Sequence, residues 1–329
     1  MKVLVRGAGV AGLTLAHELA LRGASVIVVE RRRAIAGSAS WQAGGMLAPW
    51  CERESAEEPV LTLGKGAADW WDAALPGHVV RTGTLVVAPA RDTVELDRFV
   101  QRTSGFSVVD GDAIAALEPD LAGRFRRGLL FAGEAHLDPR KALVALTGKL
   151  VGMGVRFEFG YGAVLAPGAF DFEADCTGMG SSASGLRGVR GEMLLLRTRD
   201  VALARPVRLL HPRFPVYVVP RADHMFMVGA TMVESAADGP VSARSTMELL
   251  GAAYALHPAF GEAELVEAGA GVRPAFADNL PRVSRDGNRV SINGLYRHGF
   301  LLAPAMAKQA ADVILDNPTA RELVHEAHR

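Results

Sequence analysis

The 329-residue sequence lacks several features that would place a protein in a specialised class. It has only two cysteines and no C-x-x-C pair or histidine–cysteine cluster, so neither a disulfide framework nor a metal site is indicated. Its 36 lysines and arginines balance its 36 acidic residues, so no net charge would attract it to nucleic acid or to an anionic membrane. No apolar run approaches the ~20 residues of a membrane span, and Arg6 interrupts the apolar N-terminus before it could act as a signal peptide. We therefore expect a soluble, cytoplasmic protein.

Glycine, by contrast, is abundant, and three of the 36 glycines define the first motif. Gly7, Gly9 and Gly12 have G-x-G-x-x-G spacing, between an apolar run at 2–5 and an expected helix at 13–21. In a dinucleotide-binding turn the first glycine permits the tight bend, and the second lets the backbone approach a pyrophosphate. The third glycine lets helix and strand pack closely. The positive N-terminal end of the helix would hold the phosphates.

An acidic residue stands where such a turn requires one. Glu30 ends a second apolar run and follows Gly12 by 18 residues, close to the ~20-residue offset of an acid that binds a ribose hydroxyl. The alternative is a glycine-rich turn in an ordinary α/β protein, but two strands, a helix and an acid in register favour dinucleotide binding. Glu30 would repel a 2′-phosphate, so we interpret Arg31 to Arg33 as a solvated edge that also braces the adenosine end.

The length exceeds what one hydrophobic core usually serves, so we expect two joined domains. Beyond the N-terminal motif, short alternating strands interrupted by helices indicate an antiparallel domain inserted twice. We expect an α/β protein with a Rossmann-like domain of residues 1–78, 135–190 and 268–329 and an inserted antiparallel-sheet substrate domain of residues 79–134 and 191–267. The segment 51–58 is interpreted as a charged turn before a helix in which Trp70 and Trp71 serve packing.

The pattern of glycines also bears on the cofactor. The chain has one dinucleotide fingerprint, whereas a flavoprotein that uses NADPH usually needs a second. Glycine-rich backbone recurs at Gly44-Gly45, at Thr177-Gly178 and from Gly294 to Gly299. An extended ligand that touches several segments fits FAD better than NAD. Without a nicotinamide site, the electrons must come from the organic substrate.

Six further motifs carry a family resemblance. They are GAGVAG (7–12), AGGMLAP (43–49), VYVVPR (216–221), VGATM (228–232), GVRP (271–274) and LYRHGFLLAP (295–304). Through these motifs, spread over nearly the whole chain, the sequence resembles the D-amino-acid oxidase family, and within it most closely the glycine oxidases of thiamine biosynthesis.

The resemblance implies roles for individual residues. Arg273 and Arg297 would bind the substrate carboxylate, Tyr217 would hydrogen-bond or wall the substrate, and Met232 would line the pocket. FAD would be held by residues from across the chain: Gly7, Gly9, Val10, Ala11, Gly12, Glu30, Arg31, Ala39, Ser40, Gly44, Gly45, Met46, Leu295, Tyr296, His298, Gly299, Phe300 and Leu301. To this set the residues themselves add Thr177 and Gly178, which end an expected strand and suit backbone contact with a cofactor.

Residue chemistry agrees with these assignments without requiring them. Arginine captures a carboxylate through two parallel charge-assisted hydrogen bonds. On composition alone, however, a surface or ion-paired role is favoured for each arginine. Tyr217 could equally be a core aromatic, and a methionine such as Met232 is more often core packing. His298 is expected to contact the flavin through its backbone only, with no acid–base role.

The implied reaction is an FAD-dependent oxidation of glycine, other small amines or D-amino acids in thiamine thiazole synthesis. A hydride would pass from the substrate α-carbon to flavin N5, and dioxygen would take the electrons as hydrogen peroxide. The imine would feed thiazole formation or hydrolyse to glyoxylate and ammonia. No general base is required if the amine binds neutral, because positioning carries most of the catalysis. Two alternatives stay open: a dehydrogenase with another electron acceptor, and a flavin-binding protein without amine oxidation. A homo-oligomer is expected because relatives often form tetramers.

The chain departs from the family at two places. The segment 163–171 is shorter than the excursion most relatives carry there. After Leu47 the chain continues as Ala48-Pro49-Trp50-Cys51, and we expect Trp50 to narrow the entrance in favour of a small substrate.

Overall fold

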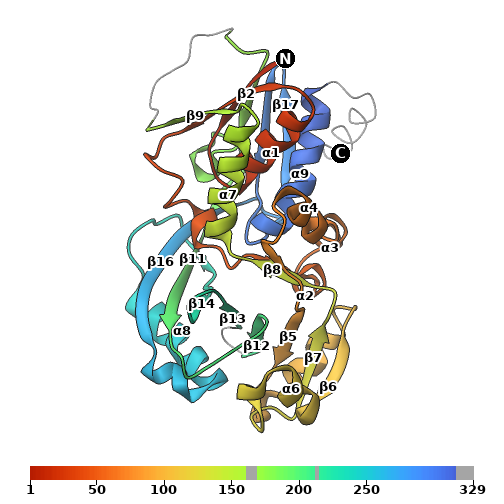
Figure 1. Cartoon of the computed structure of the whole chain (residues 1–329), viewed down its shortest axis with the longest axis vertical. Helices are drawn as coiled ribbons and strands as arrows, with labels where there is room; N and C mark the ends of the chain where they lie inside the picture. Colours follow the sequence, from red (N-terminus) through yellow and green to blue (C-terminus); the bar gives the residue numbers. More distant parts are fainter. Residues whose placement is uncertain (161–168, 212–214, 316–329) are drawn as a thin grey trace.

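The structure is a computed structural model that describes residues 1–160, 169–211 and 215–315 (Figure 1). The expected shortening at 163–171 therefore lies largely outside the described residues. Within them, three sheets organise the fold. No helix of this part of the chain is long and apolar enough to cross a membrane.

A six-stranded sheet forms the upper half of the molecule as drawn (Figure 1). The middle of its strand β1 is fully buried, with Val3, Leu4 and Val5 all at 0% exposure, as a parallel strand covered on both faces requires. All neighbouring strands are parallel except the edge pair β17–β18. The spatial order is β17 (Arg282–Asp286), β18 (Arg289–Asn293), β10 (Phe172–Asp175), β1 (Lys2–Arg6), β2 (Ser25–Glu30) and β9 (Arg156–Phe159).

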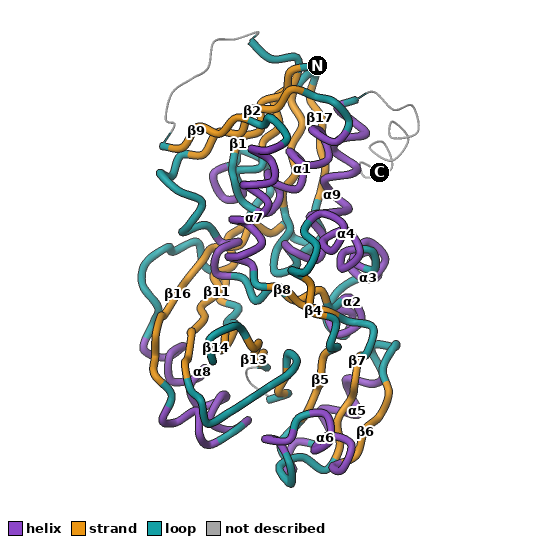
Figure 2. Tube along the Cα trace, viewed as in Figure 1, coloured by secondary structure: helices purple, strands orange, loops and turns teal. Residues whose placement is uncertain are grey.

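Helices α1 (Val10–Leu21), α7 (Pro139–Gly152) and α9 (Gly299–Ile314) lie alongside this sheet and share its core (Figure 2). Helix α1 begins at Val10, three residues earlier than expected, and α9 begins at Gly299 instead of near Leu302. Both helices thus start directly at glycine-containing turns. The helices α2 (Pro49–Arg53), α3 (Glu58–Gly64) and α4 (Ala67–Ala74) follow the first βαβ unit.

Trp70 and Trp71 belong to α4 and serve packing, as predicted. Trp71 is fully buried, stacks on Phe300 at 5.5 Å between ring centroids and donates its indole N–H to the Phe300 carbonyl at 2.8 Å. Trp70 meets His17 edge to face. Trp71 therefore anchors the start of α9, and Trp70 packs against α1.

A nine-stranded sheet forms the lower half. It is antiparallel, as predicted, except for one parallel pair, β5–β12. Helices α5 (Val94–Val100), α6 (Gly111–Leu117) and α8 (Ala243–Leu256) accompany it. Its strands are β15 (Val233–Glu234), β11 (Arg187–Arg197), β14 (Met225–Gly229), β13 (Val216–Pro220), β12 (Val207–Leu209), β5 (Thr84–Val87), β7 (Arg127–Phe131) and β6 (Ser107–Asp110), with β16 (Glu264–Ala275) paired to β11.

A small sheet lies between the two large ones (Figure 1). It joins β3 (Met46–Leu47), β8 (Ala135–Leu137) and β4 (Val79–Val80). We propose the two-domain division given above, because the six-stranded sheet draws its strands from the segments assigned to the Rossmann-like domain. The continuous pairing of β11 with β16 runs across two of the expected boundaries, those at 190/191 and 267/268.

Candidate active site

A cavity of about 840 Å³ extends from the carboxyl ends of β1, β2, β10 and β18 to the nine-stranded sheet. Ligands of open parallel sheets bind beyond this end of the strands. All of the predicted cofactor and substrate residues except Gly12 line this cavity. It therefore brings together segments that are far apart in the sequence.

The glycine turn has the geometry that its spacing predicts. Gly7 has φ +100°, and a Cβ there would lie 2.5 Å from the Cys176 carbonyl oxygen. A Cβ at Gly12 would lie 1.9 Å from the Gly7 carbonyl oxygen. Gly12 therefore serves the close packing of α1 on the turn, which explains why it does not line the cavity.

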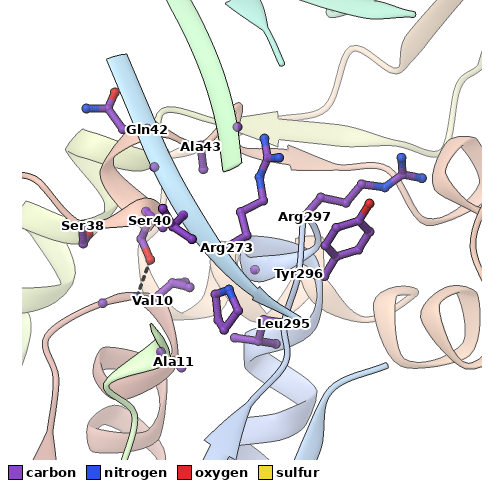
Figure 3. Close-up of a pocket in the computed structure, with 18 of the residues that line it drawn as sticks. Val10, Ala11, Ser38, Ser40, Gln42, Ala43, Arg273, Leu295, Tyr296 and Arg297 are labelled. Carbon is purple, nitrogen blue, oxygen red and sulfur yellow. Dashed lines mark hydrogen bonds between the residues drawn. The ribbon is translucent and has the colours of Figure 1, made fainter. Parts of the chain in front are cut away.

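Helix α1 points its N-terminus at the cavity. The first turn of a helix leaves backbone N–H groups without intrahelical partners. Ser40, on the 3₁₀ turn η1 (Ala39–Gln42), accepts the Val10 N–H at 3.1 Å (Figure 3). The predicted residues Ala39 and Ser40 thus lie beside the predicted Val10 and Ala11.

Glu30 is held rigidly at the end of β2. It is 7% exposed, and its two carboxylate oxygens accept the backbone N–H groups of Ala8 and Arg32, each at 3.0 Å. The carboxylate is thereby fixed across the first strand–turn–helix unit, facing the cavity.

The Gly44–Gly45 segment is held in place by the buried side chain of Arg221. Gly45 has φ +78°, and a Cβ there would lie 2.1 Å from the Leu137 carbonyl oxygen, so only glycine fits. Arg221 pairs with Asp138 at 2.6 Å and donates to the Ala43 carbonyl at 3.1 Å. This support was not predicted, although Arg221 ends one of the quoted motifs.

The two predicted carboxylate-binding arginines differ in their partners. Arg273 rises from β16 into the cavity and donates to the Thr231 carbonyl at 3.0 Å (Figure 3). No salt bridge joins it to an acidic side chain among the described residues. Gly191 on β11 makes room for it, because a Cβ there would lie 2.0 Å from Arg273 Nη2.

Arg297 is already paired. Its Nε lies 2.9 Å from Glu52 Oε2, and its Nη2 donates to the Ser55 hydroxyl at 2.5 Å. Met232 Sδ lies 3.4 Å from Arg297 Nη1 and from the Tyr296 hydroxyl. Met232 is half exposed at the cavity wall and is not a core residue.

Tyr217 lies between two charged side chains. Its hydroxyl donates to Glu52 Oε1 at 2.6 Å and accepts from Arg208 Nη1 at 3.0 Å. Arg208 also binds Glu54 at 3.1 Å and packs over the rings of Phe99 and Tyr217. The phenol is therefore fixed in place.

These charges perturb the pKa values of the site. Burial alone would raise the pKa of Glu52, but Arg297 and the other surrounding cations, with the Tyr217 hydrogen bond, lower it to about 2. Burial and the neighbouring arginines lower the pKa of His298 to about 4, against the opposing effect of Glu52. Burial lowers the pKa of Arg273 to about 10, so Arg273 remains a cation at neutral pH.

Two sequence interpretations are corrected here. Glu52 is not part of a charged surface turn: it lies on α2, is 9% exposed and lines the cavity. Pro49 at the start of α2 was the available signal for a short helix at this position. Trp50 does not narrow the entrance, because its indole packs on Gly105 and Gly133, away from the described lining of the cavity.

Comparison with known proteins agrees with this geometry. The family model described as FAD dependent oxidoreductase, DAO, matches residues 2–313. A Rhizobium etli protein named as a thiamine biosynthesis oxidoreductase, ThiO, is 62% identical over 96% of this chain and 97% of its own length. A glycine oxidase of Geobacillus kaustophilus is 26% identical over 98% of this chain and 94% of its own. The crystal structure of glycine oxidase from that organism has the same fold, with a TM-score of 0.81 at 22% identity over 95% of this chain and 94% of its own.

Proposed function

The chain belongs to the DAO family of FAD-dependent oxidoreductases, and we propose that it oxidises glycine or a similarly small amine or D-amino acid to supply thiamine thiazole synthesis. One observation carries the substrate class. Arg273 is a partly buried cation in the cavity with no acidic partner among the described residues, and it lies next to the expected flavin segments. A substrate carboxylate would supply the missing charge. The ThiO name of the 62% identical relative supports the same assignment.

The residues of the cavity fit FAD. The glycine turn and the start of α1 offer backbone N–H groups to a pyrophosphate, and Glu30 offers a carboxylate to a ribose hydroxyl. The Gly44–Gly45 segment and the 295–301 turn would hold the flavin ring. A Cβ at Gly45 would clash with the Leu137 carbonyl and with Pro139, so the residue must be glycine for the segment to lie here. We propose the complete predicted set as the cofactor contacts, with Gly12 acting through helix packing.

Bound FAD supplies the hydride acceptor that turns an amine into an imine. The chain's own residues orient the substrate. Arg273 holds the substrate carboxylate. The hydrogen-bonded side chains of Tyr217, Glu52 and Arg297 form a wall that limits the orientation of the rest of the substrate. Positioning of this kind supplies a large part of the rate. His298 has a pKa of about 4 and a backbone role at the start of α9, so we assign it no proton transfer.

The test is the visible spectrum of the purified protein, recorded before and after anaerobic glycine. We expect a yellow protein that glycine bleaches and that releases hydrogen peroxide when air returns. Bleaching by another amine alone would replace the substrate. Bleaching without peroxide in air would favour a dehydrogenase with another electron acceptor. A flavin that no amine bleaches would leave a flavin-binding protein and overturn the proposal.

A further inference from the structure

The buried carboxylate of Glu52 has so far been described only as part of the cavity wall. It stands in the substrate end of the cavity and contacts Tyr217, Arg297 and His298. Resting on the proposed function, we infer that Glu52, together with the Tyr217 oxygen, binds the amino group of the substrate while Arg273 binds its carboxylate. Glu52 thus makes the site selective for amino acids over plain carboxylates.

The hydrogen bonds of Tyr217 fix the direction of its proton. A phenol has one O–H donor and two acceptor lone pairs. Arginine can only donate, so the phenol oxygen accepts from Arg208 Nη1 at 3.0 Å. Ionised Glu52 can only accept, so the phenol O–H points to its Oε1 at 2.6 Å. The second acceptor lone pair meets only the weak Cys51 thiol donor, with Sγ 3.9 Å from the phenol oxygen. It suits a stronger N–H donor and not a carboxylate.

Arg297 acts mainly on Glu52. Its Nε lies 2.9 Å from Oε2, and the Ser55 hydroxyl binds its other end. Neither the Arg297 nor the His298 contact at Oε2 has good hydrogen-bond geometry, so this buried carboxylate oxygen has ion-pair contacts but no hydrogen bond. It is therefore placed to accept one more donor, and a substrate amino group provides it.

The charges of the cavity complement an amino carboxylate whose amine is neutral. Arg297 and Glu52 neutralise each other, and Arg208 is neutralised by Glu54. Arg273 remains positive without an acidic partner in the described structure, and its guanidinium points in a different direction from that of Arg297 (Figure 3). A ligand with a carboxylate for Arg273 and a neutral amine whose N–H groups donate to Glu52 leaves no charge uncompensated.

Glu52 holds the amino group and does not take its proton. Burial would raise its pKa, but the surrounding cations and the Tyr217 hydrogen bond lower the pKa to about 2. A carboxylate of that basicity stays ionised throughout the working pH range and acts as a fixed acceptor.

The experiment compares two ligands of equal length on the FAD-containing protein. Glycine has both groups, whereas acetate has the carboxylate alone. Binding is measured in the absence of air. For acetate, the Kd is obtained from the change in the flavin spectrum on titration. For glycine, which reduces the flavin, it is obtained from the concentration at which flavin bleaching saturates. In Glu52→Gln we expect glycine to bind about tenfold or more weakly, as the loss of a charge-assisted hydrogen bond predicts. Acetate should bind as well as before or better, because a negative charge near it has been removed.

Tyr217→Phe gives an independent test should Glu52→Gln fail to bind FAD. It should weaken glycine and leave acetate unchanged, because the phenol donates to Glu52 and not to the carboxylate. Glu58→Gln is the matched control: this acid is exposed and pairs with Arg53, so neither affinity should change. The inference is overturned if Glu52→Gln weakens both ligands equally, or if Tyr217→Phe weakens acetate as much as glycine.

Failure of the proposed function gives a different result. If the wild-type protein binds glycine but no amine bleaches its flavin, the proposed oxidation is wrong. The ratio of the Kd for glycine to the Kd for acetate still tests the role of Glu52. A bleached wild type with an unchanged ratio in both variants leaves the reaction intact and removes only the role of Glu52.

Discussion

At the scale of single residues, the partners of a side chain decide its role more than its type. Arg221, Arg273 and Arg297 all lie around one cavity. Arg221 is paired with Asp138 and supports a loop, whereas Arg297 is paired with Glu52. Only Arg273 lacks an acidic partner in the described residues. The sequence could nominate arginines for a carboxylate, but it could not rank them, because their acidic partners come from distant segments.

The position of Arg273 depends on a glycine opposite it. A Cβ at Gly191 would lie 2.0 Å from Nη2 of Arg273, so Gly191→Ala must displace the guanidinium. We expect the apparent Kd for glycine to rise at least about tenfold, the typical cost of a lost charge-assisted bond, with FAD content unchanged. Gly251→Ala on α8, where a Cβ meets nothing within 4 Å, is the control for the measurement. Unchanged affinity in Gly191→Ala would show that Arg273 is not the carboxylate-binding group.

The buried acid Glu134 should make stability depend on pH. It is 1% exposed and accepts the Cys51 N–H at 2.7 Å. Burial raises its pKa from 4.5 to about 8, with the nearby Glu52 adding to the rise and Arg208 opposing it. Between these two values the native chain keeps a proton that the unfolded chain loses, so this contribution to stability falls as pH rises.

Glu134→Gln stays neutral at every pH and should lack that fall. Thermal unfolding is measured between pH 5 and pH 9. As pH rises, the free energy of unfolding of the variant should increase relative to that of the wild type by on the order of 1–3 kcal/mol. The exposed variant Glu58→Gln should follow the wild type. A constant difference between Glu134→Gln and the wild type across this range would mean that Glu134 is ionised throughout.

At the scale of elements, the contact between β1 and α1 is set by a glycine. A Cβ at Gly12 would lie 1.9 Å from the Gly7 carbonyl oxygen, and neither backbone can move independently. We expect Gly12→Ala to destabilise the protein by several kcal/mol, of the order seen for overpacked sites, and to lose FAD because the α1 N-terminus shifts. Gly148→Ala on α7 is the matched control, since its Cβ meets nothing and helix propensity favours alanine by about 1 kcal/mol. Normal FAD content in Gly12→Ala would contradict the role given to this packing.

Elements with strong local patterns could be predicted from the sequence. The β1–α1–β2 unit follows from apolar runs, glycine spacing and the acid at Glu30, and these signals are local. The short helix α2 could not be predicted as part of the site. Glu52 is buried only because α2 meets Tyr217, Arg297 and His298, whose segments lie more than 150 residues away. Likewise, Trp50 turns away from the entrance because Gly105 and Gly133 leave space for its indole.

At the scale of the whole molecule, the cavity is shared between the two large sheets. Its walls include the glycine turn after β1 and residues 270–274 of β16, and β16 packs on η1. The cavity therefore requires both sheets to be in place, and a ligand that fills it binds to residues of both. The order of the segments along the chain follows from the sequence, but their convergence depends on long-range strand pairing, such as β11 with β16.

Removal of FAD should consequently loosen both sheets at the cavity and leave the far end unchanged. We expect faster amide hydrogen exchange in the FAD-free protein at 7–12, 39–46, 270–274 and 295–301, which line or support the cavity. Strand β6, at the far edge of the nine-stranded sheet, is the internal control. Thermal stability should rise again on adding FAD, by about 2.7 kcal/mol at 100 times its Kd. If exchange rises at 7–12 but not at 270–274, the six-stranded sheet holds the cofactor alone, and the two sheets are coupled by their protein contacts and not by FAD.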